Sequence, residues 1–476
     1  MSNLPPITAG ASWAENGQIV LTRKLNGPLD VVPAAGGALA KLTQLDTSAG
    51  EHGHLFPQVL PGGRGVLFTL RKGRDYTDTA ASSIAVLDQT TGKRNVILEG
   101  ASFARYGAGR LVFVRGPSVF SVPFDLNLLS VTGPPVPLLE TVVVHRDLAF
   151  GHFDVSAGGT LVFLEGPPTA APNTSVLLLD RTGKEKSLPV PPGEYYGARF
   201  SPDGGRLVLS RFENLRGTIV IYDRGRNILT TLTPEPGSQF IPIWSPDGRH
   251  IAFSRYTDAM PTLSAKNADG SGEIEPLTEP SEDAQFADSW SPDGKTILYT
   301  VAYTADRGPK RKLLSTDLWL VSHGDRRSAR PWFESPFRET AGTFSPDGRW
   351  IAYVSDESGV KEIYIRPYPG PGAAVKVSNG FAIEPLWSRD GRELFYRTGE
   401  NAEKFMTVAI RTLPELTISA PQLLFSSEVE VGGQEDRSRE YDVSADGHFV
   451  GQRSSRTEEP DRQLVVVTNW AKTLGP

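Results

Sequence analysis

Phe200-Ser201-Pro202-Asp203-Gly204 is the stretch of sequence that decides the fold, because it recurs along the chain. Close copies begin with Phe or Trp, precede a short apolar run, and end at Gly248, Gly294, Gly348 and Gly391. Proline presets the backbone for a type I turn, Asp accepts hydrogen bonds from nearby backbone, and Gly takes the left-handed conformation that follows. Each copy is therefore predicted to be the turn of an antiparallel hairpin.

Weaker copies of this turn lie on both sides of the clear ones. They bring the number of units to ten, with steps of 43 to 56 residues between turn glycines. A period of this length with turn residues at fixed offsets is typical of stacked four-stranded sheets. We therefore expect an all-β fold, a β-propeller of four-stranded antiparallel blades, with about ten blades. The turn glycines are Gly17, Gly63, Gly109, Gly159, Gly204, Gly248, Gly294, Gly348, Gly391 and Gly447.

The two ends of the chain suggest how such a ring closes. After the tenth turn only two further strands are expected, so the last unit lacks its outer strand. Residues 4–8 have the character of an outer strand without a unit. We expect a single domain over residues 4–470, closed by pairing of Ile7 with the strand around Val466, because an open ring would expose a long sheet edge. The alternative is two smaller propellers that divide near residue 195.

Tryptophan occupies the first position of several turns. Four of the eight tryptophans, Trp13, Trp244, Trp290 and Trp387, lie there. The strands that follow the turns are almost entirely apolar, which indicates burial on both faces. We therefore expect these four indoles to pack between neighbouring sheets.

Composition excludes several classes of protein. The net charge of −6 offers no basic field for a phosphate backbone, so nucleic-acid binding is not expected. The absence of cysteine excludes disulfides and thiolate chemistry. There is no apolar run of 18 residues, and residues 1–13 lack the features of a signal peptide. We expect a monomer that does not insert into a membrane.

Known catalytic patterns are not fulfilled. His145-Arg146-Asp147-Leu148 spells the tetrapeptide of a kinase catalytic loop, but His152 stands where the metal-binding Asn should follow, and the other kinase motifs are missing. There is no Gly-x-Ser-x-Gly elbow of a serine hydrolase. No catalytic residue and no cofactor are predicted.

Two segments resemble metal sites without completing one. His52 and His54 share a strand face beside Glu51, but a site needs a third ligand, so a polar strand is the simpler interpretation. Asn267-Ala268-Asp269-Gly270 resembles part of a calcium loop, yet Ala265 and Pro276 stand where acids belong. A hairpin turn is expected there, and no metal site is predicted.

Candidate ligand-binding residues lie where the chain enters each inner strand, since these positions would ring one mouth of the propeller channel. Loops on a rigid scaffold often carry recognition, so the basic loop 305–315 is a further candidate. The inner-strand candidates are Tyr195, Tyr196, Arg199, Gln239, Asp288, Arg338, Glu339, Glu384, Arg439 and Glu440.

The pattern Ser-Pro-Asp-Gly-Arg/Lys-x-Ile-Ala-Phe/Tyr resembles the repeat of TolB-type propellers, relatives of the WD repeat. The segments Ala34 to Gly37, Glu51 to Gln58 and Arg462 to Trp470 also look like the C-terminal propellers of bacterial serine/threonine kinases. The TolB likeness implies protein–protein binding. The kinase likeness implies an extracytoplasmic or periplasmic sensor module, without kinase activity.

The sequence thus favours a noncatalytic binding or sensor module for a protein, peptide or cell-envelope ligand. Two alternatives stay open. Propellers can carry a hydrolase or lyase site in the channel, and a repeat array can be a purely structural scaffold.

Overall fold

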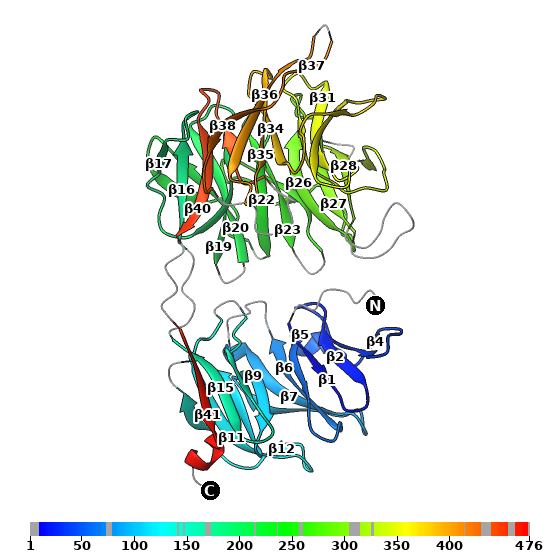
Figure 1. Ribbon diagram of the computed structural model, residues 1–476, viewed down its shortest axis with the longest axis vertical. Coiled ribbons are helices and arrows are strands. Elements are labelled where there is room, and N and C mark those ends of the chain that lie inside the picture. Colours follow the sequence, from blue (N-terminus) through cyan, green and yellow to red (C-terminus); the bar gives the residue numbers. More distant parts are fainter. Residues whose placement is uncertain are drawn as a thin grey trace. The chain divides into compact units, whose positions relative to one another are not determined.

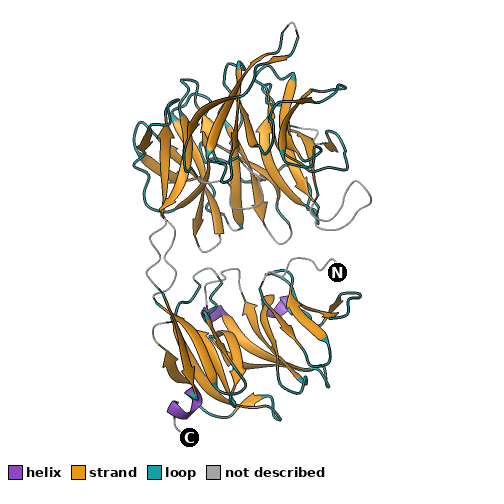
Figure 2. Cartoon of the chain, in the orientation of Figure 1, coloured by secondary structure: helices purple, strands orange, loops and turns teal. Residues whose placement is uncertain are grey.

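In the part of the chain that it describes, the computed structural model shows strands and three short 3-10 turns (Figure 2). It divides into two compact units: unit 1 is Met1–Ala171 with Thr457–Pro476, and unit 2 is Pro172–Arg456. The strands form ten sheets among the described residues. Those residues are 9–72, 79–139, 142–145, 148–166, 173–213, 216–235, 237–256, 260–303, 315–324, 328–413, 415–429, 439–455 and 462–474.

Unit 2 holds six of the sheets (Figure 1). One sheet combines strands from both ends of the unit: β39 (Asp442–Val443), β40 (Phe449–Ser455), β16 (Asn173–Leu179) and β17 (Glu185–Ser187). The next two are β18 (Glu194–Phe200), β19 (Arg206–Glu213), β20 (Arg216–Asp223) and β21 (Ile228–Thr231); then β22 (Ser238–Trp244), β23 (His250–Tyr256), β24 (Thr262–Asn267) and β25 (Glu275–Pro276).

The remaining three sheets of unit 2 follow in the same order. They are β26 (Ala284–Trp290), β27 (Thr296–Ala302), β28 (Thr316–Ser322) and β29 (Ala329–Pro331); then β30 (Glu339–Phe344), β31 (Trp350–Ser355), β32 (Glu362–Pro367) and β33 (Val375–Lys376). The last is β34 (Ile383–Trp387), β35 (Glu393–Thr398), β36 (Lys404–Arg411), β37 (Thr417–Ile418) and β38 (Gln422–Ser426).

Six hydrophobic clusters join the six sheets of unit 2, one cluster at each interface. The cluster with Phe395 and Phe449 joins the last sheet to the sheet of β16 and β40, and the cluster with Val176 and Phe200 joins that sheet to β18. The interfaces therefore close a ring. Because β40 pairs with β16 along Asn173 to Leu179, strands from both ends of the unit seal it.

Unit 1 holds the other four sheets. The first two are β1 (Ala11–Trp13), β2 (Gln18–Thr22), β3 (Leu29–Pro33) and β4 (Ala40–Lys41); then, after η1 (Thr47–Ala49), β5 (Glu51–Val59), β6 (Gly65–Lys72), β7 (Ser82–Asp88) and β8 (Arg94–Glu99), with η2 (Thr79–Ala81) before β7. The third is β9 (Ser102–Gly107), β10 (Arg110–Arg115), β11 (Ser118–Asp125), β12 (Ser130–Val131) and β13 (Val136–Leu139). The fourth is β14 (Phe153–Val155), β15 (Thr160–Glu165) and β41 (Gln463–Thr468), followed by η3 (Trp470–Leu474).

β41 does not join the sheet of the tenth turn, where the sequence placed it. Val466 lies opposite Val162 of β15, so the C-terminal strand completes the fourth sheet of unit 1. Ile7 lies outside the described residues. The chain forms two compact units where a single domain over 4–470 was expected; the boundary lies at Pro172, not near residue 195, and residues 457–476 belong to unit 1.

The turns have the predicted chemistry. In the first clear copy, Asp203 Oδ1 accepts from Ser201 Oγ at 2.5 Å and from the Gly205 N–H at 3.0 Å, and Gly204 has φ of 71°. Corresponding bonds join Ser245 to Asp247 and Ser291 to Asp293. The turn is therefore set by contacts within five residues, which explains why it is visible in the sequence.

Three of the four tryptophans are buried as predicted: Trp244, Trp290 and Trp387 are 8%, 6% and 3% exposed. Trp244 Nε1 donates to the carbonyl of Arg199 in the preceding sheet at 3.2 Å. The prediction for Trp13 is wrong, because its side chain is 69% exposed. Its sheet, β1 to β4, is the first sheet of unit 1 within the described residues.

Candidate functional site

The inner strands of unit 2 contain a recurring bulge that the sequence did not reveal. The β18–β19, β22–β23, β30–β31 and β34–β35 pairs each shift register, and a residue with positive φ lies in each shift. These residues are Gly197, Ile241, Ala341 and Glu384, with φ from 53° to 64°. A bulge re-aims the side chains beside it. Non-glycine residues in this region store backbone strain, which packing must offset.

The bulges bring charged residues from different sheets together. Arg199 Nη1 donates to the Tyr441 carbonyl at 3.4 Å, and its Nη2 donates to the carbonyl of Arg439. Arg439 Nη1 donates to the Pro385 carbonyl at 3.4 Å, next to Glu384. We call Arg199, Asp288, Glu384, Arg439 and Glu440 the axial cluster.

Glu440 and Asp288 tie the axial cluster to the backbone and to neighbouring strands. Glu440 Oε2 accepts from the Gly197 N–H at 3.0 Å. Asp288 Oδ2 accepts from Thr300 Oγ1 at 2.7 Å. The structure therefore brings together five of the ten predicted residues.

Burial dominates the electrostatics of the axial cluster. It raises the pKa of Asp288 well above its ordinary value, although Arg439 and Arg199 act in the opposite direction. Burial likewise raises the pKa of Glu384, against the guanidiniums of Arg397 and Arg199. Burial and the positive charge of Arg439 lower the pKa of Arg199 to about 10. The charges of the cluster thus depend on one another.

Two buried polar atoms in the axial cluster, Glu384 Oε1 and Arg199 Nε, lack a hydrogen-bond partner among the described residues. Unsatisfied buried polar groups are costly in a folded protein. Their presence in one place therefore suggests a site that is completed by another molecule.

Arg397 is a member of this region that sequence reasoning missed. It is fully buried, lies 3.4 Å from Glu384 Oε2 and donates to the carbonyls of Ala402 and Val429. The corresponding residues of the β19 and β23 strands are Ser210 and Ser254. An arginine in a position that is Ser210, Ser254 or Val354 in other sheets was the available indication.

Aromatic side chains lie at the same end of the inner and second strands. Phe240 stacks on Tyr256 with ring centroids 5.2 Å apart. Tyr256, Phe337 and Phe381 are 40%, 38% and 40% exposed, and Tyr196 is half-buried. We call Tyr196, Phe240, Tyr256, Phe337 and Phe381 the aromatic rim.

The other predicted residues have different surroundings. Tyr195 is buried in a sheet interface and its hydroxyl donates to the Pro191 carbonyl. Gln239 is buried against Thr233. The Arg338 N–H donates to Asp356. Glu339 accepts from Ser335 and Ser355, and burial raises its pKa to about 8. Most of the basic loop 305–315 lies outside the described residues.

Unit 1 has the same bulge with different chemistry. Phe56 and Phe103 have φ of 55° and 47°, and their rings meet edge to face with centroids 5.3 Å apart. Phe150 and Phe153 pack against Phe103. The inner strands of unit 1 therefore meet in an apolar cluster, whereas those of unit 2 meet in a charged one.

The histidine and calcium-like segments have structural roles. His54 is fully buried: its Nδ1 lies 2.7 Å from Thr43 Oγ1 and its Nε2 lies 3.0 Å from Arg94 Nη1. Asp269 Oδ1 accepts from the N–H and hydroxyl of Ser271, which makes the expected hairpin turn. Among the described residues, no group of three His, Cys, Asp or Glu side chains could hold a metal ion. No helix within the described ranges is long and apolar enough to cross a membrane.

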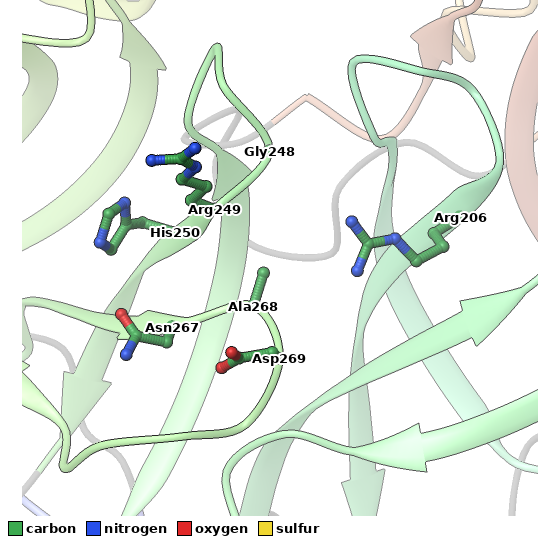
Figure 3. A pocket seen from close by; sticks show the side chains of 7 residues that line it. All are labelled: Arg206, Gly248, Arg249, His250, Asn267, Ala268 and Asp269. Carbon is green, nitrogen blue, oxygen red and sulfur yellow. The ribbon is translucent and has the colours of Figure 1, made fainter.

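A pocket of about 510 Å³ lies away from the axial cluster, between the turn ends of two neighbouring sheets (Figure 3). Arg206 of β19 lies on one side, and Ala268 and Asp269, which follow β24, lie on the other. Sequence reasoning did not identify this pocket, since it arises between two sheets.

The chain has a β-propeller architecture, and comparisons with solved structures return propellers. A putative TolB from Agrobacterium tumefaciens is 17% identical with a TM-score of 0.47, covering 60% of this chain and 99% of that one. TolB from Acinetobacter baumannii is 16% identical with a TM-score of 0.40, covering 71% and 84%. Oligogalacturonate lyase from Vibrio parahaemolyticus is 12% identical with a TM-score of 0.38, covering 59% and 96%. No family model and no curated protein matches the chain.

Proposed function

We propose that unit 2 is a noncatalytic recognition module that binds a protein or peptide partner, or a peptide-bearing cell-envelope ligand, at the axial cluster and aromatic rim. The observation that carries the proposal is the pair of unsatisfied buried atoms, Glu384 Oε1 and Arg199 Nε, in a unit that also exposes aromatic rings. Aromatic residues and Arg are the side chains enriched at the energetic centres of protein interfaces.

Site-specific photocrosslinking in cells of the source organism tests this proposal. Phe337→p-benzoylphenylalanine places the probe on the aromatic rim. Ile228→p-benzoylphenylalanine is the matched control, because Ile228 is an exposed apolar residue, 52% accessible, next to the β20–β21 turn. We expect a discrete protein adduct from position 337 that Arg439→Ala weakens. Adducts of equal yield from position 228, or none from position 337, would contradict the proposal.

A second candidate is a hydrolase or lyase site at the axial cluster. The pKa of Asp288, which burial raises well above its ordinary value, favours it, because a general acid needs a raised carboxyl pKa. Release of soluble product from a cell-envelope fraction, abolished by Asp288→Asn, would support this alternative. If neither adduct nor product forms, the structural scaffold is the remaining interpretation.

A further inference from the structure

The pocket beside Arg206 exists because of one small residue at a repeated position. In five sheets of unit 2, a residue at or just after the end of the third strand donates its N–H to the carbonyl of the residue after the turn glycine. The donors are Arg224, Ala268, His323, Tyr368 and Ile410, and the acceptors are Gly205, Arg249, Lys295, Arg349 and Arg392.

In the other sheets this position carries a large side chain that covers the aromatic ring at the start of the turn. His323 packs on Trp290 with centroids 4.9 Å apart, and Tyr368 packs on Phe344 at 4.9 Å. The guanidinium of Arg224 lies 5.2 Å from the centre of the Phe200 ring. Ile410 shares a hydrophobic cluster with Trp387.

Ala268 offers only a methyl group at this position. Trp244 is covered instead by a residue of the neighbouring sheet, Arg206, whose guanidinium carbon lies 4.8 Å from the centre of the indole. The volume that a large side chain would fill is open, and the pocket occupies it. Its size of about 510 Å³ is typical of small-molecule sites.

Two arginines that line this pocket keep guanidinium donors for a ligand, whereas the Asn267 amide already donates to Ser271. The side chains of Arg206 and Arg249 donate no hydrogen bond within the described part of the chain. Arg206 is held against the indole, so the edge of its planar guanidinium is left for a ligand. A planar edge with parallel N–H groups matches a carboxylate in bidentate geometry. His250 and Asn267 add further polar groups to the wall (Figure 3).

Asp269 limits the charge that the pocket accepts. Its Oδ1 is committed to the Ser271 turn, and its carboxylate stays in the wall opposite Arg206. A second negative charge on the ligand would meet this carboxylate. The pocket is therefore suited to a monoanion more than to a dianion.

We propose that this pocket binds a small organic monocarboxylate, with its carboxylate on Arg206 and its apolar part against the methyl group of Ala268. The carboxylate comes from a free small molecule or from an acidic peptide residue, and the chemistry is the same. This site is independent of the axial cluster and does not rest on the proposed function.

Fluorine NMR with 4-fluorobenzoate and the full chain tests the site. We expect saturable binding with a Kd of about 1 mM or tighter. Arg206→Gln should weaken it at least about tenfold, the loss typical of one charged hydrogen bond. Ala268→His, which copies the His323 arrangement, should abolish it. Arg349→Gln, an exposed arginine next to another turn, is the control and should bind as the wild type does.

Each result bears on the proposal. No saturation, or unchanged binding in both Arg206→Gln and Ala268→His, would overturn it. Equal competition by inorganic sulfate would overturn the preference for a monocarboxylate. Competition by a peptide with blocked termini and one glutamate, but not by free butyrate, would assign the peptide source, and the reverse result would assign the free molecule. If Ala268→His does not fold by circular dichroism, Arg206→Gln decides.

Discussion

Arg389 donates from Nη2 to the carboxylate of Asp442 at 3.2 Å, and from Nε to the Val443 carbonyl at 3.0 Å. Asp442 Oδ2 also accepts a hydrogen bond from the Phe200 N–H, at 2.9 Å. One carboxylate therefore links three consecutive sheets at the place where the ring of unit 2 is sealed. Proline holds the position of Arg389 in the clear turns of the other sheets, so the departure from the repeat coincides with the closure.

Replacing Arg389 with the repeat's own residue should weaken unit 2. Arg389→Pro removes both bonds and leaves the buried Asp442 carboxylate with fewer donors, so we expect a loss of about 1–3 kcal/mol in the free energy of unfolding. Denaturant titration measures it. Arg349→Ala, at an exposed turn arginine, should change stability by less than about 0.5 kcal/mol. Equal effects of the two variants would show that the closure does not depend on Arg389.

Tryptophans at the same position of the repeat should differ in their contribution to stability. Trp290→Ala removes a buried indole and should cost unit 2 about 3–5 kcal/mol. Trp13→Ala removes an exposed indole and should cost unit 1 less than about 1 kcal/mol. The unfolding transitions of the two units, followed separately by denaturant titration, provide the comparison. A loss below about 1 kcal/mol for Trp290→Ala would remove it from the core.

Unit 1 should lose stability in mild acid through His54. Burial lowers the pKa of His54 from 6.5 to about 4, and Arg94 acts in the same direction. Because Arg94 can only donate, Nε2 is the acceptor and the folded imidazole is neutral. As pH falls from about 6.5 toward about 4, the unfolded chain binds a proton that the folded chain does not, so about 2–3 kcal/mol is lost.

Denaturant titration of unit 1 between pH 7.5 and 4.5 measures this dependence. His54→Gln should be less stable at neutral pH and should flatten the slope in the same window. An unchanged slope in the variant would assign the acid sensitivity to other groups.

Glu339 should act in the opposite direction in unit 2. Burial, aided by the negative charge of Asp317, raises its pKa to about 8. The folded state therefore holds a proton that the unfolded state releases above its ordinary pKa of 4.5. The stabilisation is full below about 4.5 and is lost as pH rises through about 8.

Glu339→Gln cannot lose this proton, so unit 2 of the variant should lose less stability between pH 5 and pH 8.5 than the wild type does. Unfolding free energies at those two pH values test it. If the variant lost as much unfolding free energy between the two pH values as the wild type, a group other than Glu339 would be responsible.

The turns and their sheets could be predicted because the determining contacts are local. The bond from Ser201 to Asp203 spans two residues, and every strict copy carries the same residues. The closure could not be predicted in the same way. The run Leu464 to Val467 is apolar at every position and suits any free sheet edge, so only long-range packing selects β15 as the partner.

The sequence positions of the candidate site residues could be predicted, but not which way their side chains point. Arg199, Glu384 and Arg439 were found because they lie where the chain enters the inner strands. The bulges then decide which side chains meet, and no residue type marks them: Ile241 and Ala341 adopt positive φ as Gly197 does. Tyr195 and Gln239 consequently lie inside sheet interfaces. Ala268 was part of a recognised turn, but its importance depends on Trp244 and Arg206, which lie in other strands.

The insertion of unit 2 between β15 and β41 sets an order for biosynthesis. At ordinary translation rates, the residues between β15 and β41 take roughly 15–60 s to synthesise, so β15 is made that long before its partner strand. During that time it presents an unpaired edge, a known hazard for association with other chains. When β16 has paired with β40, Asn173 lies opposite Ser455, so the two points at which the chain leaves unit 2 are adjacent. Once unit 2 has folded, the loop that must close between Glu165 and Gln463 is effectively shorter. Unit 2 is therefore expected to fold first, and the pairing of β15 with β41 in unit 1 follows.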